Sequence, residues 1–203
     1  MVTLRSPSHQ FPEAHPTIIP PHLSWFAGTW NVTHSTLPMW KKNRNVQITY
    51  QPIPNTDSEV PRLKDDVTYQ SLSSNKIKTV RGIDKPFDVP DANVQPLKDA
   101  AFRASLAYKW RGKGWLKFVT SKWEILGYGS EEGTGRLWVV TYFAKTVFTP
   151  AGVDIYSRGG ALHVETVESI KAALAGMRGD VAKLATEIYA VSVDGARDGL
   201  VAE

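Results

Sequence analysis

Among the side chains that could transfer a proton near neutral pH, one histidine lies inside a segment with strand-like alternation. Residues 30–36 alternate between two faces, and His34 shares the face of Trp30 if the period of two is unbroken. An imidazole titrates near neutrality, so His34 could act as an acid or base, or hydrogen-bond a ligand. The alternative is a core histidine bonded to a tyrosine or to a backbone carbonyl.

Two further acid–base candidates lie in later segments. In residues 115–128, Phe118 and Glu124 share one side, whereas Trp123 lies on the other. Either set could face the interior, and the sequence leaves the choice open. A buried glutamate would have a shifted pKa, which makes Glu124 a catalytic candidate beside Tyr142 of the next segment.

Aromatic side chains recur at positions that could line one interior. Walls of aromatic rings with a few hydroxyls suit a flat, mostly apolar ligand that carries one or two polar groups. The alternative is an interior filled by its own side chains, but buried Tyr and Trp need polar partners, which favours a cavity. The predicted ligand-binding residues are Tyr50, Tyr69, Phe102, Tyr108, Trp110, Phe118 and Trp123.

The elements that must position these residues read as a series of strands. Alternation with a period of two, broken by short turns, predicts eight strands near residues 30–36, 46–51, 66–70, 76–83, 102–111, 115–128, 137–148 and 153–157. Short connections favour an all-β fold, an eight-stranded antiparallel up-and-down barrel wide enough for one small ligand. A β-sandwich is the alternative.

After residue 160 the apolar spacing becomes helical. Val167, Ile170, Leu174 and Met177 recur on one face, and a second short helix is predicted over residues 181–189. One or two C-terminal helices should therefore pack outside the barrel. The predicted organisation is a flexible, proline-rich arm over 1–20, a barrel with its helices over 21–193, and a patternless tail over 194–203.

Composition and missing motifs exclude several classes of function. The chain of 203 residues has no cysteine, which removes disulfide scaffolds, thiol catalysis and iron–sulfur clusters. It contains no Ser-His-Asp order, phosphate loop, dinucleotide fingerprint or His-Glu-x-x-His helix, which disfavours hydrolases, kinases and nicotinamide enzymes. We expect neither a metal nor a cofactor.

Charge and hydropathy bear on partners and location. The net charge of +4 is mild, and the basic and aromatic residues of 109–117 fit a solvated hairpin better than a nucleic-acid site. No apolar run is long enough for a membrane helix or a secretion signal. The expectation is a cytoplasmic monomer or homodimer without nucleic-acid or membrane partners.

Two short motifs carry a family resemblance. Phe26-Ala-Gly28-Thr-Trp30, preceded by a short turn at 21–24, and Val153-Asp-Ile-Tyr-Ser-Arg158 resemble the first and last strand motifs of lipocalins, within the wider group of calycin barrels. The resemblance implies that Arg158 lies over Trp30 next to Gly28 and closes the barrel floor through a cation–π contact. These three residues would be structural.

The combined expectation is a protein that binds a small hydrophobic metabolite, aromatic or terpenoid-like, in the barrel lumen. Two hypotheses follow from it. The chain could be an intracellular carrier or sequestering protein, or a cofactor-free cyclase or isomerase, a chemistry that the resemblance to calycin-type barrels implies. In the enzyme, which the missing secretion signal favours, His34 and a tyrosine would move or share a proton.

Overall fold

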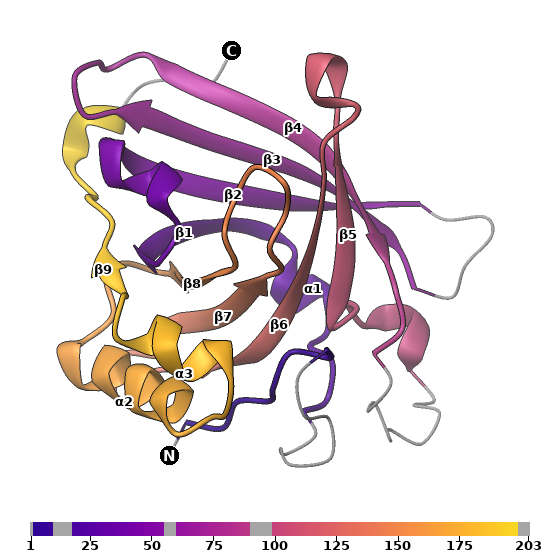
Figure 1. Cartoon of the computed structure of the whole chain (residues 1–203), viewed down its shortest axis with the longest axis vertical. Helices are drawn as coiled ribbons and strands as arrows, with labels where there is room; N and C mark the ends of the chain where they lie inside the picture. Colours follow the sequence, from indigo (N-terminus) through magenta and orange to yellow (C-terminus); the bar gives the residue numbers. More distant parts are fainter. Residues whose placement is uncertain (1, 10–17, 55–59, 90–98, 199–203) are drawn as a thin grey trace.

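The computed structural model describes residues 2–9, 18–54, 60–89 and 99–198, and these form a closed antiparallel barrel (Figure 1). The strands of the described chain follow the sheet order β2-β3-β4-β5-β6-β7-β8-β1-β9, and β1 also pairs with β2. Strands β1 to β8 therefore close on themselves, which confirms the predicted eight-stranded barrel. Their bounds are β1 Gly28–Ser35, β2 Asn43–Ile53, β3 Arg62–Ser71, β4 Ile77–Pro86, β5 Ala107–Gly112, β6 Thr120–Ser130, β7 Leu137–Phe143 and β8 Gly152–Arg158.

Short helical elements lie at the ends and on the outside of the barrel. Helix α1 (Leu23–Phe26) precedes β1, and α2 (Val164–Ala175) and α3 (Asp180–Ala185) follow β8. Short 3₁₀ turns add η2 (Pro38–Lys42), η3 (Ala100–Phe102), η4 (Gly114–Leu116) and η5 (Gly195–Arg197). None of the helices in the described ranges is long and apolar enough to cross a bilayer.

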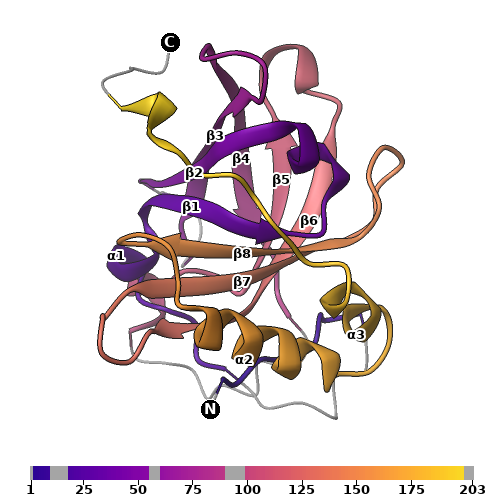
Figure 2. The same cartoon turned by 90° about the vertical axis from the view of Figure 1, so that its left-hand side faces the viewer.

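Helix α2 covers the outer face of β7 and β8, as Figure 2 shows. Its buried residues Ile170 and Leu174 share an apolar cluster with Val153 and Ile155 of β8. Alternation along β8 sends Tyr156 to the other side, into the cluster inside the barrel. The same strand therefore serves the interior and the helix layer, and it is buried on both faces.

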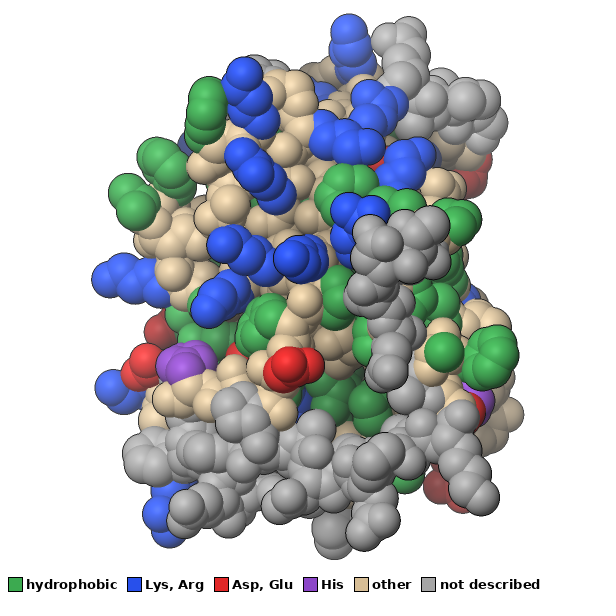
Figure 3. Space-filling view, turned by 90° about the vertical axis from the view of Figure 1, so that its right-hand side faces the viewer, with side chains coloured by type: hydrophobic (Ala, Val, Ile, Leu, Met, Phe, Trp, Pro, Cys, Tyr) green, Lys and Arg blue, Asp and Glu red, His purple; other side chains and the backbone are tan. Residues whose placement is uncertain are grey.

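The outer face of β4, β5 and β6 carries exposed basic side chains. Lys85 pairs with Lys109, and Lys109 pairs with Lys122, so three exposed lysines stand in register across three strands. Figure 3 shows Lys and Arg side chains gathered on one face of the molecule. The barrel wall thus has a helix-covered side and a solvated side.

A β-bulge in β1 changes which residues face inward. The β1–β8 register runs Val32↔Tyr156 and then His34↔Ile155, so β1 holds one extra residue at Thr33. After the bulge, His34 lies opposite an outward residue and Ser35 lies opposite the inward Asp154. The bulge therefore moves the second half of β1 out of simple alternation.

The N-terminal segment packs against the barrel. Leu4 and Arg5 are buried, and the Arg5 amide donates to the Leu126 carbonyl of β6. A Cβ on Gly127 would lie 2.3 Å from a Leu4 methyl carbon, so glycine there makes room for Leu4. Residues 2–9 therefore differ from the flexible arm predicted for 1–20, because a buried ion pair and apolar contacts fix them; residues 10–17 lie outside the described ranges.

The chain after α3 is ordered by contacts with β1, β2 and β3. The short strand β9 (Tyr189–Ala190) pairs with β1, and Arg197 donates a hydrogen bond to the Thr68 hydroxyl at 2.7 Å. Asp194 accepts from the side chains of Arg44 and Asn45. The tail predicted for 194–203 is thus attached to the barrel up to residue 198, through polar contacts that leave no periodic pattern.

Candidate functional site

Aromatic rings fill a continuous part of the barrel interior. Phe26 stacks on Tyr50 with ring centroids 4.7 Å apart, and Trp123 stacks on Tyr50 at 5.5 Å and on Tyr108 at 4.9 Å. All four side chains are almost fully buried. These four rings pack against one another, and we call them the aromatic wall of the interior.

Two carboxyl groups face this wall from neighbouring strands. In the strand registers, Asp65 of β3 lies opposite Tyr50, whereas Asp84 of β4 lies opposite Trp110. The indole Nε1 of Trp123 donates to Asp84 Oδ1 at 2.8 Å. Gly82, opposite Asp65 on β4, leaves the space that the Trp110 ring occupies, since a Cβ there would lie 2.0 Å from Trp110 Nε1.

The two carboxyls form an acid pair that we call the Asp65–Asp84 pair. Burial and the negative charge of Asp84 raise the pKa of Asp65 well above its usual range. Burial raises the pKa of Asp84 to about 7, although the hydrogen bond from Trp123 opposes the shift. A hydrogen bond between the carboxyls raises the pKa of Asp65 further, as expected if Asp65 holds a shared proton.

Other polar groups extend the inward-facing site. The Tyr156 hydroxyl of β8 is buried without a hydrogen bond of normal geometry in the described chain. Asp154, two residues earlier, accepts from the Ser35 hydroxyl and, at 3.4 Å, from Trp40 Nε1. Burial raises the pKa of Asp154 to about 7. The interior thus combines aromatic surface with acidic oxygen atoms.

The floor of the barrel is built as the family motifs predict. The Arg158 guanidinium carbon lies 4.0 Å from the centroid of the Trp30 ring, which confirms the predicted cation–π contact. Arg158 also donates to the carbonyls of Trp25, Phe26, Ala27 and Thr29. Gly28 has a φ of 100°, and a Cβ there would lie 3.5 Å from the guanidinium.

The predicted ligand-binding residues divide into two groups. Tyr50, Tyr108 and Trp123 are buried in the inner cluster, and Tyr69 and Trp110 are partly buried against it. The prediction that Phe102 and Phe118 line the interior is wrong, because these residues are 70% and 81% exposed. Phe102 lies in η3 before β5 begins, and Phe118 lies in the turn between η4 and β6, so neither is on a strand.

The prediction that His34 faces the lumen is wrong. The bulge at Thr33 turns the imidazole outward, where Lys171 and Glu168 of α2 influence its charge. Burial, followed by the positive charge of Lys171, lowers the pKa of His34. The side chain lies between the barrel and the helix layer and does not meet the aromatic wall.

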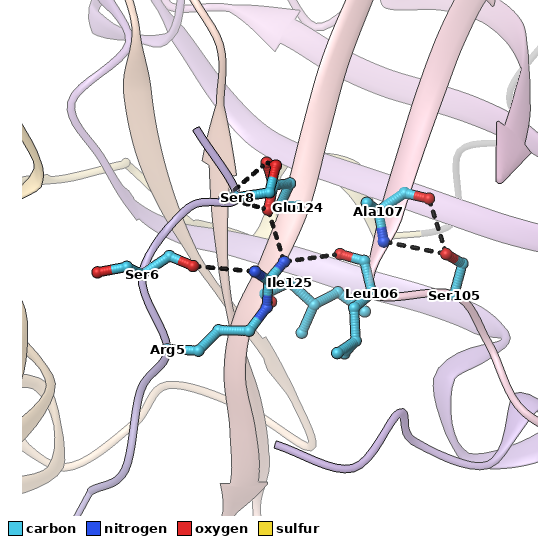
Figure 4. Close-up of polar contacts among 8 residues, drawn as sticks. All are labelled: Arg5, Ser6, Ser8, Ser105, Leu106, Ala107, Glu124 and Ile125. Carbon is cyan, nitrogen blue, oxygen red and sulfur yellow. Dashed lines mark hydrogen bonds and ion pairs between the residues drawn. The ribbon is translucent and has the colours of Figure 1, made fainter. Parts of the chain in front are cut away.

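Glu124 and Tyr142 also lie on the outer side of their strands. Glu124 accepts from Arg5 Nη2 at 2.6 Å and from the Ser8 amide and hydroxyl (Figure 4). Tyr142, its register partner, belongs to the outer apolar cluster and lies 3.4 Å from His9 Nε2. The second alternative for residues 115–128 therefore holds, with Trp123 inside and Glu124 bound by the N-terminal segment.

Sequence reasoning missed the Asp65–Asp84 pair because both residues lie just beyond the predicted strand ends. The predicted strands began at residue 66 and ended at residue 83, whereas β3 and β4 extend to Arg62 and Pro86. Extending the period of two from Val67 back to Asp65 would have placed that carboxyl on the inward face. The same rule carried from Val80 to Asp84 would have found its partner.

Comparison with known proteins identifies the architecture. No family model matches the chain, and no curated protein matches its sequence. Among solved structures, apocrustacyanin C2 superposes with a TM-score of 0.52 at 12% identity, covering 84% of this chain and 79% of that chain. Lobster apocrustacyanin A1 gives a TM-score of 0.51 at 12% identity, covering 94% and 90%. With the closed barrel and the Trp30–Arg158 floor, these likenesses give the chain the lipocalin, or calycin, fold.

Proposed function

We propose that the barrel binds a small, largely apolar molecule in its lumen. The observation that carries this proposal is the buried wall of Tyr50, Tyr108 and Trp123 facing carboxyl groups inside a closed barrel. A solid structural core has little reason to hold acidic side chains, because an uncompensated buried carboxylate is costly. A ligand site combines apolar surface with a few polar groups that orient the bound molecule.

The test is recovery of a bound molecule. The purified protein would be incubated with an extract of its source cells, examined by native mass spectrometry, and compared with the extract after release of the bound species. Val67→Trp fills the lumen from β3 and should abolish binding, since Val67 packs against the inner cluster. Lys64→Trp places the same ring on the outer face of β3 and should not affect binding.

Recovery of one compound by the native protein and by Lys64→Trp, but not by Val67→Trp, is the expected result. Equal recovery by all three proteins would place the ligand outside the lumen and contradict the proposal. A compound that returns unchanged indicates a carrier. A compound that the extract alone does not form indicates catalysis.

Cofactor-free cyclisation or isomerisation is the second candidate function. The observation that favours it is the Asp65–Asp84 pair, which can hold a transferable proton beside an aromatic wall. Asp84→Asn should abolish conversion if the pair is the acid. His34→Phe and Tyr142→Phe should retain conversion, because both side chains lie on the outer side of the barrel.

A further inference from the structure

The Asp65–Asp84 pair has acceptor atoms that the described chain does not supply with donors. Asp84 Oδ1 accepts from Trp123 Nε1, but Asp65 Oδ1 and Asp84 Oδ2 are buried and receive no hydrogen bond from a permanently protonated group of the described residues. Both residues are at most 5% exposed. Among the described groups, a proton shared between the carboxyls is the remaining way to reduce the cost of burying them.

The charged side chains of the described residues do not neutralise the pair. The described inner faces of β3, β4 and β8 contribute three buried acids, since Asp154 joins Asp65 and Asp84. The basic side chain at the floor, Arg158, directs its donors to four backbone carbonyls and its face to Trp30. Tyr50 and Tyr156, which lie near the pair, contribute hydroxyls without positive charge.

The aromatic wall suits a cation as well as an apolar ring. Tyr50 stacks on Trp123, whose indole N–H is directed at Asp84, so aromatic faces and acceptor oxygens adjoin one another. The faces of Trp and Tyr attract cations, and carboxylates form charge-assisted hydrogen bonds with N–H donors. A carboxylate ligand would instead meet like charge and acceptors that need donors.

We propose that the Asp65–Asp84 pair binds the protonated nitrogen of an amine ligand whose flat apolar body stacks on Tyr50 and Trp123. This inference rests on the proposed lumen function and narrows its ligand to a cationic class. The ammonium N–H groups donate to Asp65 Oδ1 and Asp84 Oδ2, the two atoms that receive no such donor in the described chain. The ligand takes the place of the shared proton.

The experiment compares three probes that share a ring and differ in charge. Naphthylethylammonium, ethylnaphthalene and naphthylpropionate, substituted at the same ring position, would be measured by equilibrium dialysis against the full chain. We expect the ammonium to bind about tenfold tighter than ethylnaphthalene, the gain typical of a charge-assisted hydrogen bond, and the propionate to bind weakest. Asp84→Asn should remove most of the preference for the ammonium over ethylnaphthalene.

Matched variants separate the pair from general charge effects. Asp88→Asn makes the same chemical change at an exposed position just after β4 and should keep the preference. Asp65→Asn tests the partner carboxyl if Asp84→Asn does not fold, as judged by circular dichroism. Each variant retains a side chain of similar volume, so the lumen keeps its shape.

The outcomes distinguish this inference from the proposed function. Binding of ethylnaphthalene with no gain for the ammonium, or tightest binding of the propionate, overturns the cationic ligand and leaves a lumen site standing. A preference that persists in both Asp65→Asn and Asp84→Asn also overturns it. If no probe binds and native mass spectrometry recovers no ligand, the proposed function fails and the inference fails with it.

Discussion

Arg158 combines two kinds of contact that a lysine could not reproduce. Its planar guanidinium lies on Trp30 and donates to several backbone carbonyls at once. A lysine keeps the charge but loses this fork of donors. We expect Arg158→Lys to lower the free energy of unfolding by about 2–3 kcal/mol, measured by urea denaturation. The exposed control Arg178→Lys should change it little, and equal losses in the two variants would contradict this role for the floor.

The buried carboxyl of Asp84 makes stability depend on pH in an unusual direction. Its pKa is raised to about 7 in the folded barrel, whereas an unfolded aspartate titrates near about 3.9. Between these values the folded state holds the proton more tightly, so the free energy of unfolding falls as pH rises through this window. A pKa shift of this size lowers the free energy of unfolding by an amount on the order of 4 kcal/mol. The decrease is complete a little above pH 7.

Asp84→Asn isolates this contribution. The stability of Asp84→Asn relative to the exposed control Asp88→Asn should increase from about pH 4 to about pH 7 and then remain constant. Asp154, whose pKa burial also raises to about 7, supplies a similar slope that both variants keep. Urea denaturation at several pH values measures the difference, and a difference independent of pH would contradict the raised pKa.

At the scale of elements, a buried ion pair contributes to holding the N-terminal segment on β6. Arg5 and Glu124 are 8% and 6% exposed at their side chains, and their closest atoms are 2.6 Å apart. Removing one partner leaves a buried charge, so Arg5→Ala should cost about 3–5 kcal/mol. Combining Arg5→Ala with Glu124→Gln should recover part of that loss. A double-mutant cycle by urea denaturation measures the coupling, and additive losses would show that the pair does not act as a unit.

The strands could be predicted from the sequence, but the direction of some of their side chains could not. Period-two alternation located all eight barrel strands, because each buries one face against the interior. The alternation did not reveal the bulge at Thr33, which depends on the backbone register between β1 and β8 and reverses the direction of His34. It also could not place Glu124, since the donors that allow its burial, Arg5 and Ser8, come from a distant part of the chain. The floor was predictable because Gly28, Trp30 and Arg158 lie in short motifs with fixed roles.

At the scale of the whole molecule, the two sides of the wall should differ in local stability. Strand β8 is covered by the inner cluster on one face and by α2 on the other, whereas the outer face of β4 is solvated. Amide hydrogens of β7 and β8 should therefore exchange more slowly than those of β3 and β4, since local opening of the covered strands exposes more apolar surface. Hydrogen exchange followed by mass spectrometry tests this order. Uniform protection around the barrel would contradict it.

The bulge at Thr33 has a consequence for insertions and deletions. Loops can change length without changing the two faces of a strand, but one residue added within β8 would exchange Asp154 and Tyr156 for Val153 and Ile155 in the interior. Strand β1 already carries such an extra residue, and the barrel accommodates it. Deletion of Thr33 would therefore restore simple alternation and return an imidazole to the lumen. The presence or absence of this one residue decides whether the His34 side chain lies beneath the helix layer or inside the barrel.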